Sequence, residues 1–377
     1  MFNSFLQGGF EASSFRRRDG RQLDVLAACR HDVRAGTDYR LLRGAGLGTA
    51  RDALRWHRIE ARPGVYDWSS FVPMLRAARD TGMQVIWDVC HYGVPHHLDV
   101  WSPGFPDHFA RFARAAAEVV RDETDEVPFW CPMNEISFWS WAGGHVEHIY
   151  PYGRWVGDAL KRQLARAAIA ATHALREVDG RARFLHSDPM IHIVAHPDKP
   201  EDRDAVESYR LSQFEAWDMI SGRLEPGLGG SPDLLDIVGG NFYFNNQWVH
   251  DFETMGMGHR LFRPFREMLA ELHDRYGRPI LVAETGAEGA NGTGWLRYVC
   301  HEVRAAMRRG VPVEGVCLYP VMDYPGWDDD RHCPSGLIRT DDQYDQRWAD
   351  PEFSEVLAEE AMAFAPYLSR PAAVAAE

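Results

Sequence analysis

Two glutamates close short apolar stretches of the chain and could supply a pair of carboxyl groups. Glu135 ends the stretch that begins at Phe129, and Glu284 ends the stretch that begins at Pro279. Both stretches are typical of short buried strands, where an unpaired charge is costly. Cleavage of a glycosidic bond needs two carboxyl groups that flank the bond. The pair therefore predicts a site for glycoside hydrolysis.

The two glutamates would have different roles in this chemistry. An acid must protonate the leaving oxygen, while an anion stands opposite the anomeric carbon. Carboxyl groups about 5–5.5 Å apart lead to direct attack and retention of configuration, whereas a wider gap admits water and inverts the configuration. We expect Glu135 to act first as acid and then as base, and Glu284 to be the nucleophile. An ionised Glu284 would raise the pKa of Glu135 and keep it protonated near neutral pH.

Four other side chains could assist the two glutamates. Asn134 directly precedes Glu135 and is placed to hydrogen-bond a sugar hydroxyl. Arg51 and Tyr243 are suitable groups to keep the nucleophile ionised and oriented. Each also has a structural interpretation, because an arginine can serve a buried ion pair and a tyrosine can pack as an aromatic ring. His91 can likewise bind a sugar or be a satisfied core histidine.

The elements that must position these side chains alternate between short apolar segments and longer amphipathic ones. We expect strands at Phe5–Phe10, Ala53–Ile59, Gln84–Cys90, Pro128–Met133, Ala182–His186, Ile237–Phe244, Ile280–Glu284 and Gly315–Tyr319. We expect helices at Asp107–Arg121, Trp155–Glu177, Asp202–Ile220, Leu261–Tyr276, Trp295–Arg309 and near Pro351–Phe364. This alternation predicts an α/β fold, a (β/α)₈ barrel. No linker interrupts the sequence, so we expect a single catalytic domain over residues 1–377, with 371–377 as a frayed tail.

The carboxyl ends of all eight strands open at one mouth in such a barrel. The fourth strand would bring Glu135 to this mouth and the seventh would bring Glu284. The other strand-end candidates are Glu11, Arg51, His91, Asn134, Asn241, Tyr243 and Tyr319. His186 and Asp188 also end a predicted strand and can line the sugar pocket. Aromatic residues that follow the acid can build the aglycone side or pack in the core: Phe138, Trp139, Trp141, Tyr150 and Trp155.

Composition excludes several other classes of function. The net charge of −14 disfavours a nucleic-acid partner, because no basic face is available to meet phosphates. The first residues lack the basic and apolar regions of a signal peptide, and no apolar run approaches membrane-spanning length. We therefore expect a cytoplasmic protein with no membrane partner. The six cysteines form no CxxC pair and the histidines form no HExxH motif, so we expect no metal and no other cofactor.

Six short motifs follow one another along the chain. They are Phe5–Gly9, Arg51 with Trp56–Ile59, His91–Pro95, Asn134-Glu135, Asn241–Tyr243 and Glu284–Gly286. In order and spacing, this series resembles the motifs of the glycoside hydrolase family 1 β-glycosidases, which belong to a clan of retaining (β/α)₈ enzymes. The likeness runs from about Phe5 to Ile338, as in a divergent, shortened member. It implies a carbohydrate or glycoside substrate, acid/base catalysis by Glu135 and nucleophilic attack by Glu284.

The chain departs from this family at positions that bind the sugar. Trp327 matches the last tryptophan of the family's W-S-L-L-D-N-F-E-W motif, but the sugar-binding glutamate before it is replaced by Gly326. The family's glutamine late in the first strand falls on Phe15, with Glu11 as the nearest polar substitute. Ile136 replaces the proline that usually follows the acid. The resemblance therefore implies conserved bond-breaking chemistry and an unusual sugar.

Three alternatives remain open from the sequence. A transglycosidase would use the same residues and pass the sugar to an acceptor hydroxyl. A sugar-binding barrel would bind without turnover, since both positions that usually bind the sugar are changed. A metal-dependent barrel hydrolase would be sensitive to chelators.

Overall fold

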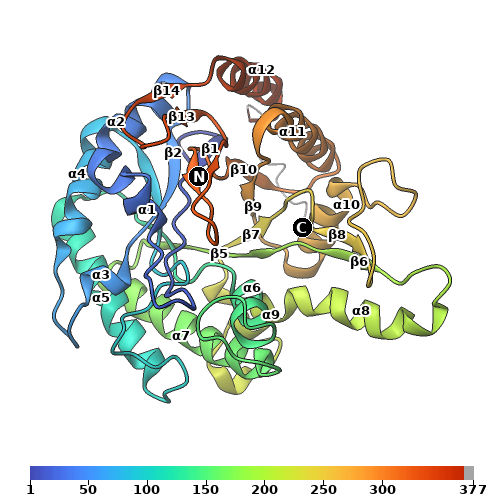
Figure 1. Ribbon diagram of the computed structural model, residues 1–377, viewed down its shortest axis with the longest axis horizontal. Helices are drawn as coiled ribbons and strands as arrows, with labels where there is room; N and C mark the ends of the chain where they lie inside the picture. Colours follow the sequence, from blue (N-terminus) through green and yellow to red (C-terminus); the bar gives the residue numbers. More distant parts are fainter. Residues whose placement is uncertain (369–377) are drawn as a thin grey trace, which may run out of the picture.

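Eight parallel strands form a closed barrel in the computed structural model, which describes residues 1–368 (Figure 1). Its strands are β1 (Leu6–Gly9), β2 (Thr49–Ala53), β3 (Gln84–Asp88), β4 (Phe129–Cys131), β5 (Arg183–Pro189), β7 (Ile237–Asn241), β9 (Ile280–Thr285) and β10 (Val313–Leu318). Strand β1 pairs with both β2 and β10, and this pairing closes the sheet. The predicted (β/α)₈ barrel is confirmed. That the chain is a single domain stays a prediction, and its segment 371–377 lies outside the described residues.

Helices surround the barrel (Figure 1). They are α1 (Val25–Ala28), α2 (His31–Gly44), α3 (Trp56–Ile59), α4 (Val72–Thr81), α5 (Phe105–Glu123), α6 (Ile136–Gly144), α7 (Gly157–Val178), α8 (Arg203–Leu211), α9 (Glu215–Ile220), α10 (Phe265–Tyr276), α11 (Gly292–Arg308) and α12 (Pro351–Leu368). Three two-stranded sheets lie outside the barrel: β6 (His192–Val194) with β8 (Gln247–Val249), β11 (Tyr324–Pro325) with β12 (His332–Cys333), and β13 (Ile338–Thr340) with β14 (Arg347–Ala349). No helix among residues 1–368 is long and apolar enough to cross a membrane.

The prediction for the second strand is wrong in its position. The strand is Thr49–Ala53, while Trp56–Ile59 forms the short helix α3. Because Arg51 and Asp52 are charged, this segment lacks the apolar pattern that is typical of a buried strand. The pattern therefore favoured a strand over the apolar residues that follow. Both charged side chains are nevertheless buried, because successive residues of a strand face opposite sides and each finds partners there.

The helix predicted over Asp202–Ile220 is divided into two. Helix α8 ends at Leu211, a 3₁₀ turn follows at Ser212–Phe214, and α9 begins at Glu215. At this turn the Gln213 side chain accepts a hydrogen bond from the Ile191 N–H at 2.9 Å and donates one to the Ile191 carbonyl at 3.0 Å. The break therefore ties the helical segment to the extended chain at Ile191.

Apolar side chains fill two regions of the fold. The larger core lies between the barrel and its helices and includes an apolar stripe on α5, all of which is buried: Phe109, Phe112, Ala113, Ala116 and Val120. A separate cluster consists of residues from the barrel strands, namely Ile86, Phe129, Cys131, Leu185, Ile237, Leu281 and Ala283. Burial of one large apolar side chain contributes about 1.5–3 kcal/mol. These clusters fix the strands whose ends carry the polar candidates.

Candidate active site

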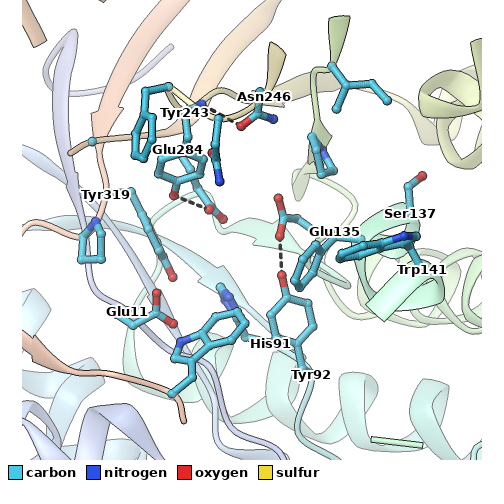
Figure 2. A pocket seen from close by; sticks show the side chains of 18 of the residues that line it. Glu11, His91, Tyr92, Glu135, Ser137, Trp141, Tyr243, Asn246, Glu284 and Tyr319 are labelled. Atoms are coloured by element: carbon cyan, nitrogen blue, oxygen red, sulfur yellow. Dashed lines mark hydrogen bonds between the residues drawn. The ribbon is translucent and has the colours of Figure 1, made fainter. Parts of the chain in front are cut away.

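A pocket of about 1220 Å³ contains both proposed catalytic glutamates. Figure 2 shows Glu135 and Glu284 pointing toward one another in this pocket. Glu284 belongs to β9, and Glu135 follows β4 and directly precedes α6. The barrel thus brings together two carboxyl groups that are far apart in the sequence, as the strand-end argument predicts.

The carboxylate of Glu284 is held by two donors. Arg51 donates from Nη1 to Oε1 at 2.7 Å, and the Tyr243 hydroxyl donates to Oε2 at 2.8 Å. Arg51 lies on β2 and Tyr243 follows β7, so donors from two further strands fix this side chain. The predicted supporting residues therefore do contact Glu284.

Arg51 is itself fixed by a second carboxylate. It donates from Nε and Nη2 to the two oxygens of Asp88, at 2.9 and 2.8 Å. Such paired hydrogen bonds suit the planar guanidinium group. Burial alone would lower the pKa of Arg51, but the charges of Asp88 and Glu284 raise it well above its usual value. A permanent positive charge therefore stands beside Glu284.

Glu135 has a different set of neighbours. Asn241 donates from Nδ2 to its Oε1 at 2.9 Å, and the Tyr92 hydroxyl donates to its Oε2. The backbone of Glu135 is left-handed, with φ of 46°, and its N–H donates to the Ser187 carbonyl at 3.0 Å. A left-handed non-glycine residue costs about 1–3 kcal/mol and is tolerated where neighbouring contacts fix it. No arginine or lysine among residues 1–368 is hydrogen-bonded to this carboxyl group.

The two environments shift the pKa values of the two glutamates to different extents. Burial, followed by the charge of Glu284, raises the pKa of Glu135 well above its usual range. Burial also raises the pKa of Glu284, but the Arg51 guanidinium opposes that rise. A proton shared by the pair is therefore held on Glu135, and the negative charge is held on Glu284.

A chain of side-chain hydrogen bonds connects Asp88 with Tyr92. His91 Nδ1 lies 3.0 Å from Asp88, and its Nε2 lies 2.9 Å from the amide nitrogen of Asn134. Because that amide can only donate, His91 Nε2 accepts and Nδ1 carries the proton. The Asn134 amide also donates to the Tyr92 hydroxyl at 3.0 Å, and its oxygen accepts from Arg51 at 2.6 Å. The chain therefore joins the neighbours of both glutamates.

These bonds bear on the prediction that Asn134 contacts a sugar hydroxyl. Its side chain is fully buried and does not line the pocket. Its oxygen accepts a second bond from the Ser187 hydroxyl at 3.0 Å, so every hydrogen-bonding position of the amide is used within the protein. A contact with a sugar stays a prediction that requires one of these bonds to be exchanged.

Glu11, His91, Tyr319 and Trp327 line the pocket. That they bind a sugar stays a prediction. Glu11 accepts a hydrogen bond from the Ser13 N–H at 2.9 Å. The ring of Tyr319 lies 5.6 Å from the Arg51 guanidinium carbon. The aromatic and acidic groups therefore border one side of the pair of glutamates (Figure 2).

Phe15 and Gly326 stand where the family has sugar-binding residues, and the two positions differ in what occupies the space around them. Phe15 is buried and its ring meets the edge of Trp327 at 5.7 Å, so it supports the pocket wall without lining the pocket. At Gly326, an added Cβ would lie 2.4 Å from an oxygen of the Asp329 carboxylate. Asp329 therefore occupies the space into which a longer side chain at Gly326 would extend.

The prediction that His186 and Asp188 line the pocket is wrong. His186 donates from Nε2 to the Leu234 carbonyl at 3.1 Å, and Asp188 accepts from the Ser137 N–H at the start of α6 at 2.9 Å. Neither residue lines the pocket.

Among the aromatic residues after Glu135, Phe138 and Trp141 line the pocket, whereas Trp139, Tyr150 and Trp155 do not. Within residues 1–368, no group of three or more histidine, cysteine, aspartate or glutamate residues is placed to hold a metal ion.

Sequence reasoning missed two residues of the network, Asp88 and Tyr92. Asp88 ends β3, so the same strand-end argument that found Glu284 could have found it. Tyr92 lies within the motif His91–Pro95, but nothing in its type or spacing indicates a contact with Glu135 or Asn134. Ser187 is a strand-end residue of the predicted active site, and its hydroxyl donates to Asn134. Only the fold brings them together.

Comparisons with known proteins agree with this fold. No family model matches the chain. The galactolipid galactosyltransferase SFR2 of Arabidopsis thaliana, a chloroplastic protein, is 22% identical over 355 residues, which cover 82% of this chain. The chain spans about half the length (54%) of that curated relative.

Solved structures of other proteins are similar to this chain in three dimensions. The β-glucosidase of Thermotoga maritima in complex with glucoimidazole aligns with a TM-score of 0.79 at 16% identity, over 95% of this chain and 98% of that chain. A structure described as the family 1 β-glucosidase of the same organism aligns with a TM-score of 0.76 at 17% identity, over 96% and 98% of the two chains. The predicted resemblance to family 1 β-glucosidases is thus confirmed at the level of the fold.

Proposed function

We propose that the protein is a retaining β-glycosidase in which Glu284 is the nucleophile and Glu135 is the acid/base. One observation carries this proposal: two buried carboxyl groups point toward each other, and within the described part of the chain only one of them is bound by a cation. Such a division places a proton donor and an anion in one pocket, as double displacement requires. Glycosidases with the same fold support the reaction class.

The reaction would proceed in two steps. In the first, a Glu284 oxygen forms a bond to the anomeric carbon while the bond from that carbon to the leaving oxygen breaks. Glu135 gives its proton to the leaving oxygen. In the second, Glu135 takes a proton from water as the water oxygen attacks the anomeric carbon, and Glu284 leaves as a carboxylate. No metal or other cofactor enters either step.

The charges of the pocket support a substrate without negative charge. Its lining includes the acidic residues Glu11, Glu135, Asp158, Glu215, Glu284, Glu288, Asp328 and Asp329. The lining cations are already paired, Lys161 with Glu215 at 2.6 Å and Arg331 with Glu288 at 2.8 Å. A phosphorylated or uronic sugar would meet these carboxylates without a free cation, so a neutral sugar is favoured.

A transglycosidase is the second candidate. The curated relative is named as a galactosyltransferase, and transfer uses the same first step. The reactions differ only in whether water or another hydroxyl attacks the glycosyl-enzyme intermediate. Product analysis with and without an added alcohol acceptor separates them: a β-glycoside of the acceptor indicates transfer, and free sugar alone indicates hydrolysis.

Substitution of Glu284 tests the proposed function. We expect Glu284→Gln and Glu284→Gly to reduce kcat/KM on aryl β-glycosides by at least about 10³-fold, since the nucleophile is lost. Azide should restore turnover in Glu284→Gly by attacking from the vacated side. Full activity in both variants, on a substrate that the parent cleaves, would exclude Glu284 as nucleophile.

The raised pKa of Glu135 predicts the pH dependence of the same reaction. The first step needs protonated Glu135, so kcat/KM should fall as the pH rises through this raised pKa. Glu135→Gln should remove this alkaline limb while turnover of glycosides with activated leaving groups persists. An alkaline limb that is unchanged in Glu135→Gln would contradict the acid assignment.

A further inference from the structure

We propose that the pocket continues beyond Glu135 into a groove that binds an apolar aglycone, an alkyl or acyl chain. This inference rests on the proposed function, because the groove would hold the group that leaves from the sugar. We define the aglycone groove by the pocket-lining residues Phe138, Trp141, Ile191, Tyr209, Phe244 and Trp248.

The groove extends from the catalytic pair without interruption. Phe138 and Trp141 come from α6, which begins directly after Glu135, and their rings lie 5.9 Å apart. Figure 2 shows Trp141 on the far side of Glu135 from Glu284. A leaving group bonded to the oxygen that Glu135 protonates would therefore extend along these rings.

Residues from a different part of the fold complete the groove. Tyr209 lies on α8 and Trp248 on β8, and their rings meet edge to face at 6.1 Å. Phe244 follows β7 and is 59% exposed, and Trp141 is 43% exposed. Large apolar rings exposed at the mouth of a polar pocket favour an apolar ligand that covers them.

Several polar side chains along the groove are already hydrogen-bonded within the protein. The Lys161 ammonium donates to Glu215 at 2.6 Å, and the Ser137 hydroxyl donates to Asp188 at 3.0 Å. Gln213 donates to the carbonyls of Ile191 and Arg210 at 3.0 and 2.6 Å. A second sugar would have to compete with these bonds for those side chains, whereas a hydrocarbon chain needs no hydrogen-bonding partner.

The size of the pocket agrees with a long ligand. Its volume of about 1220 Å³ is above the roughly 300–1,000 Å³ that is usual for small-molecule sites. One sugar ring between the two glutamates occupies only part of this space. An aglycone that continues for several carbon atoms would fill the rest.

A series of alkyl glycosides tests the groove. The substrates are methyl, butyl and octyl β-glucosides and β-galactosides below their micellar concentrations, with cellobiose as a sugar aglycone. We expect kcat/KM to rise at least tenfold from butyl to octyl, because burial of each methylene strengthens binding by about a factor of four. Dissociation constants measured by calorimetry with Glu284→Gln should fall in the same order.

Matched variants assign the effect to the groove. Phe244→Ala and Trp248→Ala should reduce the octyl-to-methyl ratio severalfold. Trp348→Ala is the control, because Trp348 is 46% exposed on β14 and lies outside the pocket. It should leave the ratio unchanged.

The outcomes separate this inference from the proposed function. Turnover with equal efficiency on methyl and octyl glycosides, or a preference for cellobiose, overturns the apolar groove and leaves the glycosidase intact. Binding that strengthens with chain length in the absence of any turnover supports the groove and overturns the glycosidase. A chain-length effect that persists in Phe244→Ala and Trp248→Ala also overturns the groove.

Discussion

Strand β2 separates two networks of buried charges. On the inner side, Arg51 is hydrogen-bonded to Asp88 and Glu284. On the outer side, the neighbouring Asp52 lies 2.8 Å from His31 Nε2 and accepts a bond from the Tyr39 hydroxyl at 2.6 Å. Adjacent residues of one strand thus enter networks on opposite faces of the sheet.

The outer network is closed to solvent. The other imidazole nitrogen of His31 lies 2.8 Å from Asp38, which forms an ion pair with Arg347 of β14 at 2.6 Å. Burial alone would lower the pKa of His31, but the two carboxylates raise it to about 9. His31 is therefore an imidazolium that joins α2 to β2, and none of these side chains lines the pocket that contains Glu135 and Glu284.

The comparison shows that a buried charge does not by itself indicate a catalytic site. Both networks contain carboxylates whose desolvation is offset by cations and hydrogen bonds. Only the inner network presents a carboxylate, that of Glu284, to a pocket that contains a second carboxyl group. We interpret the outer network as structural and the inner one as catalytic, and the predictions below test that division.

Arg51→Gln should have the largest effect, because it disrupts stability and activity together. It leaves Asp88 and Glu284 without their shared cation, so we expect the free energy of unfolding to fall by about 3–5 kcal/mol. We also expect kcat/KM to fall by about 10²–10³-fold, because the negative charge on Glu284 is no longer stabilised. Chemical denaturation and steady-state kinetics measure the two effects. A stable variant with full activity would contradict the role of Arg51.

A matched pair of substitutions separates the networks directly. Asp88→Asn and Asp52→Asn each remove one buried carboxylate, from the inner and the outer network respectively. Both should lower the free energy of unfolding by a few kcal/mol, but only Asp88→Asn should lower kcat/KM, by about 10²-fold. Activity is measured well below the unfolding temperature of each variant. Equal losses of activity would show that the division is wrong.

The outer network predicts a pH dependence of stability. His31 has a pKa of about 9 in the folded protein and about 6.5 when unfolded, so the folded state binds the proton more tightly. Its contribution, on the order of 3 kcal/mol, is complete below about pH 6.5 and is lost as the pH rises through 9. Free energies of unfolding between pH 6 and pH 10 measure this loss. His31→Gln should remove it, and an identical pH profile in the variant would refute the buried imidazolium.

The positions of the two glutamates of the proposed catalytic pair were largely predictable from sequence, and the outer network was not. Glu135 and Glu284 follow apolar strands, and that position predicts where their carboxyl groups emerge in a barrel. The predicted bounds of strand β2 are wrong because its buried residues Arg51 and Asp52 are charged, which is not typical of a buried strand. His31, Asp38 and Arg347 belong to no motif, and their interaction depends on helix packing that sequence periodicity does not specify. The sequence therefore predicts where the two carboxyl groups lie better than it predicts the buried contacts around them.

The most direct test of the account is to trap the glycosyl-enzyme intermediate. A 2-deoxy-2-fluoro β-glycoside with a good leaving group slows both steps, and the second step can become slow enough for the intermediate to accumulate. Mass spectrometry of the protein and of its peptides should find one fluorosugar per chain, bonded to Glu284. A label on another residue would contradict the assignment of Glu284 as the nucleophile. So would the absence of a label in protein that cleaves the corresponding unfluorinated glycoside and is inactivated by the reagent.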